Sequence, residues 1–233
     1  MSKDLTQGRP FRVLLQFSLP VIAGNLFQLF YTLADTVIVG RTLDAQALAA
    51  VGSTTIVIYF VLCFVQGFTG AFGIALSSYV AQNYGAGQYR RIGEGVRACL
   101  VQIELCNVLM CALLLGCRHL VVPLFLDSPT AEVIRYSDGY LFAVCPFYVV
   151  LGLLMVFRTA IQSMGNSRTP FEACVIELVM RILGSVGLAA LLAPYGLSYT
   201  GICLSHTLAW LGATALLMPV YFRLMKALPK SEQ

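Results

Sequence analysis

The stretch GNLFQLFYTLADTVIVGR, residues 24–41, is apolar over most of its length, yet it contains one carboxylate, Asp35, and ends at Arg41. It belongs to an apolar block that is long enough to cross the roughly 30 Å hydrocarbon layer of a membrane as a helix. An acidic side chain inside such a helix is costly and usually faces a cavity or a partner. The stretch therefore predicts a membrane helix that carries a polar group.

The composition of the whole chain extends this prediction. Apolar residues make up 58% of the 233 residues and charged residues only 11%, whereas a soluble domain is roughly a quarter charged. The mean hydropathy is +0.81. We expect an all-α polytopic membrane protein whose residues 1–233 form a single transmembrane lobe. Six apolar blocks are predicted as its spans, with the fourth able to start as early as Glu132: residues 11–40, 46–82, 95–122, 139–163, 170–193 and 199–225.

The second block is longer than a single bilayer crossing requires, so it is either one long bent helix or two short spans. Positive charges distinguish the two, because Lys and Arg gather on the cytoplasmic side of a membrane protein. If the second block is a single span, most of the basic residues lie on the same side of the membrane as both termini, and three basic residues lie on the other side. The shared side holds Lys3, Arg9, Arg12, Arg90, Arg91, Arg97, Arg168, Arg223, Lys226 and Lys230, and the other side holds Arg41, Arg118 and Arg135.

This distribution favours six spans in the plasma (inner) membrane with both termini cytoplasmic. The N-terminal apolar run exceeds the h-region of a signal peptide and lacks a small-x-small cleavage site, so we expect it to stay as the first helix. The net charge of +4 follows from the cytoplasmic basic residues. It indicates contact with anionic membrane lipid and not with nucleic acid.

Asp35 lies on a polar stripe of the first span. At 3.6 residues per turn, Gly24, Gln28, Tyr31, Thr32 and Asp35 fall on one face of the helix. One interpretation is structural, with Asp35 bonded to a hydroxyl or paired with an arginine for packing. The other interpretation is a carboxylate in a lumen that exchanges a proton or a sodium ion as substrate moves, with Gln28, Tyr31 and Thr32 lining the cavity.

Glu177 and Arg181 form a predicted second polar centre in the fifth span. Their i, i+4 spacing puts both on one helix face, within reach of an ion pair. A structural pairing and a role in cation or substrate handling both remain open. Glu104, Arg158 and His206 are weaker candidates, which we expect to make hydrogen bonds between helices.

Sequence motifs of enzymes and of ATP-driven pumps are absent from the chain. There is no phosphate-binding G-x-x-x-x-G-K-[ST] loop, no H-E-x-x-H and no nucleophile elbow. The eight cysteines contain no C-x-x-C pair and are interpreted as small apolar side chains. We therefore expect no enzyme activity, no metal site and no cofactor beyond a coupling ion, H+ or Na+.

The beginning of the chain resembles a known family. LTQGRPFRVLLQFSLPVIAGNLFQLFYTLADTVIVGR, followed by ALAAVG at 47–52, resembles the first helices of multidrug and toxic compound extrusion (MATE) transporters. Members of that family are cation-coupled antiporters with twelve spans in two six-helix lobes. The resemblance implies that Asp35 matches the first-helix aspartate that takes part in proton or sodium coupling. It also supports a single long, bent second helix.

Later segments resemble the other lobe of the same family. They are YVAQNYGAGQYRRIGEGVRACL (79–100), PFYVVLGLLMVFRTAIQSMGNSRTP (146–170), IELVMRILGS (176–185) and GICLSHTLAWLGA (201–213). The chain thus looks like the start of one lobe joined to the end of the other near residues 60–78, with about half of a usual transporter absent. Two copies could enclose the central cavity, since lobes of one orientation pair about an axis along the membrane normal.

The resemblance predicts a half-length antiporter that exports organic cations and drugs after dimerisation or with a second half-transporter. Substrate cations would be held by aromatic side chains and a carboxylate. Two alternatives remain open. One is a flippase-like relative for a lipid-linked substrate, and the other is a non-transporting, internally deleted remnant or partner subunit.

Overall fold

The computed structural model describes residues 11, 15–27, 30, 45–123 and 130–229, and in this part of the chain every regular element is helical. The prediction of an all-α protein is confirmed. A first helix, Leu15–Phe27, is called the N-terminal helix below. The later α-helices are α2 (Ala45–Gly85), α3 (Tyr89–Gly116), α4 (Arg118–Val121), α5 (Ala131–Val144), α6 (Tyr148–Ser163), α7 (Arg168–Leu192) and α8 (Ser198–Ala227), with 3-10 turns η1 (Cys145–Phe147) and η2 (Ala193–Tyr195).

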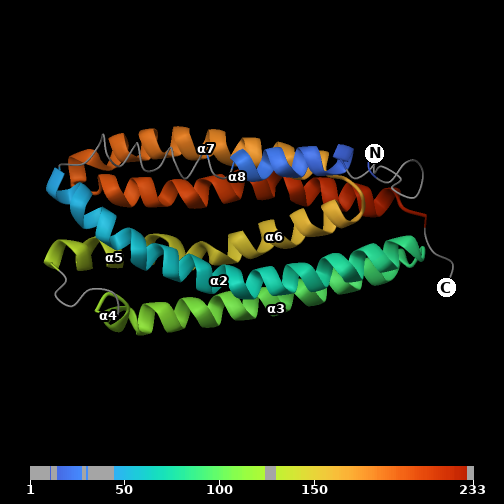
Figure 1. The fold of residues 1–233 in the computed structure, drawn as a ribbon, viewed down its shortest axis with the longest axis horizontal. Helices are drawn as coiled ribbons and strands as arrows, with labels where there is room; N and C mark the ends of the chain where they lie inside the picture. Colours follow the sequence, from blue (N-terminus) through green and yellow to red (C-terminus); the bar gives the residue numbers. More distant parts are fainter. Residues whose placement is uncertain (1–10, 12–14, 28–29, 31–44, 124–129, 230–233) are drawn as a thin grey trace.

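Four helical stretches in the described residues are long and apolar enough to cross a membrane. They are Tyr89–Gly116, Ala131–Ser163, Arg168–Tyr195 and Ser198–Ala227. The block predicted as one long second span lies within α2, a continuous helix of 41 residues, which is about 60 Å long at 1.5 Å per residue. Figure 1 shows α2 running diagonally along the bundle. The protein is therefore embedded in a membrane, with helices that run along a common direction.

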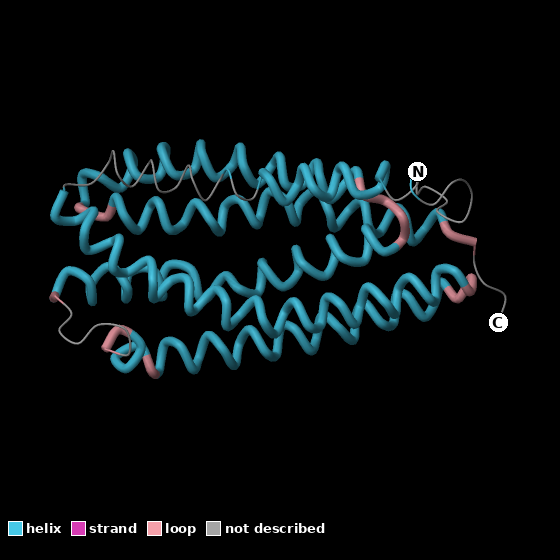
Figure 2. Tube along the Cα trace, viewed as in Figure 1, coloured by secondary structure: helices cyan, strands magenta, loops and turns pink. Residues whose placement is uncertain are grey.

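Three short turns connect the long helices, and each contains a glycine with a left-handed backbone. Gly87, Gly165 and Gly196 have φ angles of 72°, 84° and 69° and lie between α2 and α3, α6 and α7, and α7 and α8. Other residues pay a steric cost at such angles, so glycine favours a tight reversal here. The short turns let α2 and α3, and α7 and α8, pack as antiparallel neighbours, whereas α6 and α7 diverge after their turn (Figure 2).

The fourth predicted span is interrupted at Pro146. The helix begins at Ala131, where the Val133 amide donates to the Thr130 hydroxyl at 3.4 Å and caps the first turn. It changes to the 3-10 turn η1 at Cys145–Phe147 and continues as α6. Proline has no amide hydrogen and cannot complete an α-helical ladder, which favours a break here; Pro219, in contrast, lies inside the continuous α8.

Helix α6 is at the centre of the bundle. It packs against α2, α3 and α8, while α7 packs along α8. In Figure 1, α7, α8 and the blue N-terminal helix form one side of the molecule, and α2, α3, α5 and α6 form the other. Close contact of α7 with α8 depends on Gly201, where a Cβ atom would lie only 2.6 Å from the Leu188 carbonyl oxygen.

Candidate functional site

A buried ion pair joins α6 to α7. Arg158 of α6 donates through Nη2 to Glu177 Oε1 of α7, and the two side chains are only 11% and 4% exposed. Glu177 belongs to the buried face of α7, which also contains Cys174, Arg181 and Gly184 at helical spacing. Removing two charges from water is costly, and pairing offsets much of that cost.

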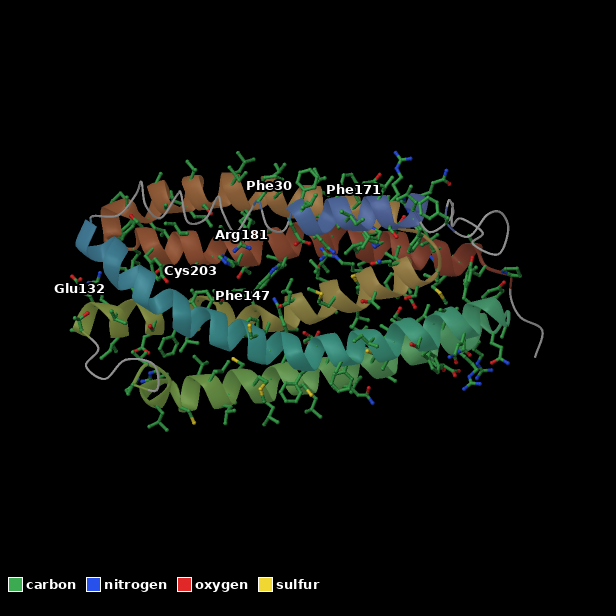
Figure 3. All side chains as sticks on the ribbon, in the orientation of Figure 1. Phe30, Glu132, Phe147, Phe171, Arg181 and Cys203 are labelled. Carbon is green, nitrogen blue, oxygen red and sulfur yellow. The ribbon has the colours of Figure 1, made fainter. Side chains whose placement is uncertain are left out.

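A second polar contact joins α7 to α8. Arg181 Nη2 contacts His206 Nε2, and Figure 3 shows Arg181 between the ribbons of these two helices. An arginine only donates hydrogen bonds, so the acceptor in this contact is Nε2 of His206. Around the imidazole, the rings of Tyr140 and Trp210 are edge-on at centroid distances of 6.3 Å each.

The two contacts create one polar centre that spans three helices. Glu177 and Arg181 lie one turn apart on α7, as predicted. The ion pair of Glu177, however, is made with Arg158 of α6. Arg158 and His206, which the sequence marks as weaker candidates, are the direct partners across the helix contacts. We call Arg158, Glu177, Arg181 and His206 the polar centre.

A serine pair holds α7 and α8 together beside this centre. Ser185 donates to Ser205 at 2.8 Å, and Ser205 in turn donates to the Ile202 carbonyl at 2.6 Å. Both serines are fully buried. The hydrogen bond between them lies one turn from Arg181 and links α7 to α8 beside the polar centre.

The N-terminal helix packs on α7 close to the polar centre. A Cβ atom on Gly24 would lie 3.2 Å from Cys174 Sγ, one turn before Glu177. The Phe27 and Phe171 rings are 5.7 Å apart. Gly24 is the described member of the predicted polar stripe, so the stripe starts against the charged face of α7.

The other predicted residues of the first span lie outside the described residues: Gln28, Tyr31, Thr32 and Asp35. Their predicted roles stay predictions. Among the residues that the structure does describe, no group of three or more His, Cys, Asp or Glu side chains is placed to hold a metal ion. All eight cysteines are described and free.

A cavity opens near the turn between α6 and α7. Its volume is about 330 Å³, and it lies between the N-terminal helix, α2 and α6. The lining residues are Phe17, Ser77, Thr159, Gln162, Ser163 and Gly165. Ser163 donates to Ser77 at 2.9 Å across this cavity. The lining offers hydroxyls, an amide and an aromatic ring, which suits an amphipathic molecule.

A membrane-embedded helical bundle with charged residues paired in its interior is a common arrangement in transport proteins. Comparison with known proteins makes this assignment specific. The chain matches the MatE family over residues 20–186, more than half of its length, and it belongs to that family.

Known relatives agree with this membership. The chain is 29% identical over 227 residues to the probable multidrug resistance protein YoeA of Bacillus subtilis (strain 168), covering 93% of this chain and 45% of YoeA. It is 25% identical over 232 residues to the multidrug export protein MepA of Staphylococcus aureus (strain MSSA476), covering 91% and 45%. A solved outward-facing multidrug resistance MATE family transporter shares the fold, with a TM-score of 0.77, 17% identity and coverage of 97% and 49%.

The chain spans about half the length of the relatives that it matches. The prediction of a MATE-like protein is confirmed. The prediction that it is not an enzyme is also confirmed, because the family to which the chain belongs is one of transporters.

Proposed function

We propose that this chain is one lobe of a cation-coupled exporter of organic cations and drugs, and that two copies assemble into the transporter. The observation that supports this proposal is the half-length match, in which nearly the whole chain corresponds to half of a drug exporter. One lobe leaves a central cavity open on one side. A second lobe of the same orientation would close it.

In the proposed topology, six spans place both termini on the cytoplasmic side of the plasma membrane. The spans are the first apolar block, α2, α3, the combined α5 and α6, α7 and α8. The turns after α2 and after α6 lie at the same end of the bundle in Figure 1. Arg90, Arg91 and Arg168 lie at these turns, and such clustering favours a cytoplasmic location for this end.

Asp35 is proposed as the residue that binds the coupling ion, H+ or Na+, with Gln28, Tyr31 and Thr32 lining the cavity beside it. The polar centre, including Glu177 and Arg181, would supply the second group of charges in each lobe. The observation that supports a link between the predicted stripe and the polar centre is the position of Gly24. This member of the stripe lies against Cys174, one turn from Glu177.

Asp35→Asn tests this assignment in proteoliposomes loaded with a fluorescent organic cation. We expect gradient-driven transport to be lost while insertion and folding stay normal. Asp138→Asn is the matched control, because Asp138 lies 3.8 Å from Arg118 in a separate ion pair whose side chains are 31% and 29% exposed. Normal pumping by Asp35→Asn would refute the coupling role.

Oligomeric state tests the assembly. Crosslinking in liposomes should give a dimer, and mixing active chains with Asp35→Asn chains should lower transport more steeply than the fraction of mutant chains. A monomer that transports at the full rate would refute the two-copy arrangement.

A lipid-linked substrate is the second candidate, because the polar centre contains two arginines and one glutamate. Such a flippase-like protein would move an anionic head group, which arginine binds well. Transport of a fluorescent anionic lipid and not of an organic cation would favour it. No transport of either, with a separate half-length partner restoring it, would favour a partner subunit or a deleted remnant.

A further inference from the structure

A carboxylate without a cationic partner lies in the middle of α3. Glu104 is near the centre of the Tyr89–Gly116 helix, and its Oε1 atom is buried with no hydrogen-bond partner. The described residues provide no ion pair for it; its polar contact is Asn107, whose Nδ2 is 3.4 Å from Oε2. A carboxylate at this depth in a membrane needs neutralisation.

Two more oxygen-bearing groups lie next to this carboxylate. Asn107, one turn further along α3, is only 2% exposed, and its Nδ2 donates to the Tyr148 carbonyl at 2.9 Å. Tyr148 is the first residue of α6, directly after the η1 turn that contains Pro146. Figure 3 labels Phe147 at this junction, below the ribbon of α8. A carboxylate, an amide and a backbone carbonyl therefore meet where a membrane helix is broken.

The backbone of α6 approaches these groups closely because residue 152 is glycine. A Cβ atom on Gly152 would lie 2.5 Å from Glu104 Oε1 and 2.6 Å from Asn107 Nδ2. Any larger side chain would have to push both groups out of position. The small residue thus keeps the carboxylate and the amide against the first turn of α6.

From this arrangement we propose that Glu104, Asn107 and the Tyr148 carbonyl form a binding site for a sodium ion between α3 and α6. A half-turn of the Asn107 amide exchanges its nitrogen for its oxygen, and amide oxygens, carboxylates and backbone carbonyls are the ligands that hard cations prefer. The Tyr148 carbonyl belongs to the first turn of α6, and a carbonyl oxygen has two lone pairs, so it can serve the helix and still contact a cation in place of Asn107 Nδ2. One carboxylate matches a single positive charge.

A proton fits the observed groups less well than sodium does. For a proton on Oε1, the described residues show no hydrogen bond that would hold the new O–H. A proton on Oε2 would find an acceptor only if the Asn107 amide turned, and without a cation that turn would set the amide oxygen against the Tyr148 carbonyl oxygen, where Nδ2 now donates at 2.9 Å. Sodium instead uses the lone pairs of all three oxygens and needs no acceptor.

Sodium binding is measured on the purified full chain, in detergent, without any requirement for transport. Thermal unfolding is followed in sodium chloride and in choline chloride at equal ionic strength, together with equilibrium binding of radioactive sodium. A ligand that binds only the folded state raises the midpoint of unfolding. We expect a saturable, sodium-specific rise and one bound ion per chain.

The site variants are Glu104→Gln and Asn107→Leu, which should lose both the shift and the bound ion. Glu94→Gln is the matched control, because Glu94 makes an exposed ion pair with Arg90 at the end of the same helix, and it should keep both. Where a site variant does not fold, Glu104→Asp shortens the carboxylate arm and should weaken sodium binding.

The outcomes separate this site from the coupling role proposed for Asp35. Sodium binding that survives in Asp35→Asn and is lost in Glu104→Gln supports the site. Sodium binding that survives in Glu104→Gln, or a wild-type chain that responds to pH but not to sodium, overturns it. Neither result depends on whether the chain transports drugs.

Discussion

The contact of α7 with α8 at Gly201 leads to a prediction of opposite effects for two Gly→Ala variants. In Gly201→Ala, the new Cβ would lie 2.6 Å from the Leu188 carbonyl oxygen, 2.7 Å from its carbon and 2.9 Å from the Ala189 nitrogen. These are backbone atoms, so no side-chain rotation relieves the clash and the two helices must move apart. Gly187 of α7, in contrast, has no atom within 4 Å of the corresponding position.

Overpacking of this kind costs about 1–3 kcal/mol, and the backbone contact places Gly201→Ala near the upper end. Alanine is a better helix former than glycine by about 1 kcal/mol, which offsets part of the loss. We therefore expect a net destabilisation of roughly 2 kcal/mol for Gly201→Ala. Gly187→Ala should instead gain up to about 1 kcal/mol, because only the helix preference changes.

Equilibrium unfolding in mixed micelles measures both free energies. Trp210 is the one tryptophan of the chain and is 6% exposed on α8, so its fluorescence reports directly on this helix. A change of equal sign and size in the free energy of unfolding of the two variants would refute the close backbone contact. A Gly201→Ala chain as stable as the wild type would do the same.

Two further predictions concern contacts of α7. Removing one partner of the buried pair, as in Arg158→Met or Glu177→Leu, should cost about 3–5 kcal/mol, whereas the double variant should regain most of the loss because no charge is left alone; additive losses in the same unfolding assay would contradict a direct pair. Gly24→Cys should form a disulfide with Cys174 under mild oxidation, because a Cβ on Gly24 would lie 3.8 Å from the Cys174 Cβ, close to the mean of about 3.8 Å for disulfides. Gly70→Cys, which has no neighbour within 4 Å, is the control, and mass spectrometry that finds equal crosslinking to Cys174 in both variants would disprove the packing of the N-terminal helix on α7.

The all-helical architecture follows from the sequence because membrane spans are local features. An apolar run of about 20 residues satisfies its own backbone as a helix, without information from the rest of the chain. A break at Pro146 is favoured by one missing amide hydrogen, but Pro219 lies inside the continuous α8, so proline alone does not locate a break. The single long α2 required an argument about charge on both sides of the membrane, which is a property of the whole chain.

Partners across helices could not be predicted in this way. Helical spacing correctly puts Glu177 and Arg181 on one face, but it suggests a pair within one helix, whereas Glu177 binds Arg158 from the preceding helix. Glu104 and Asn107 are neighbours by spacing, yet the Tyr148 carbonyl is 41 positions away from Asn107 and comes near it only through packing of α3 on α6. The sequence therefore predicts that Arg158 and His206 make contacts between helices, but only the packing of the helices identifies Glu177 and Arg181 as their partners.

The ion pair between α6 and α7 also has a consequence for biosynthesis. Helix α6 leaves the ribosome before α7, so Arg158 reaches the translocon while its counter-charge is still being made. An arginine in an apolar helix opposes partition into lipid by up to about 3 kcal/mol at the helix centre. Stable entry of α6 is thus expected to wait for the segment that brings Glu177, and a ribosome stalled before residue 177 should leave α6 only loosely held in the bilayer.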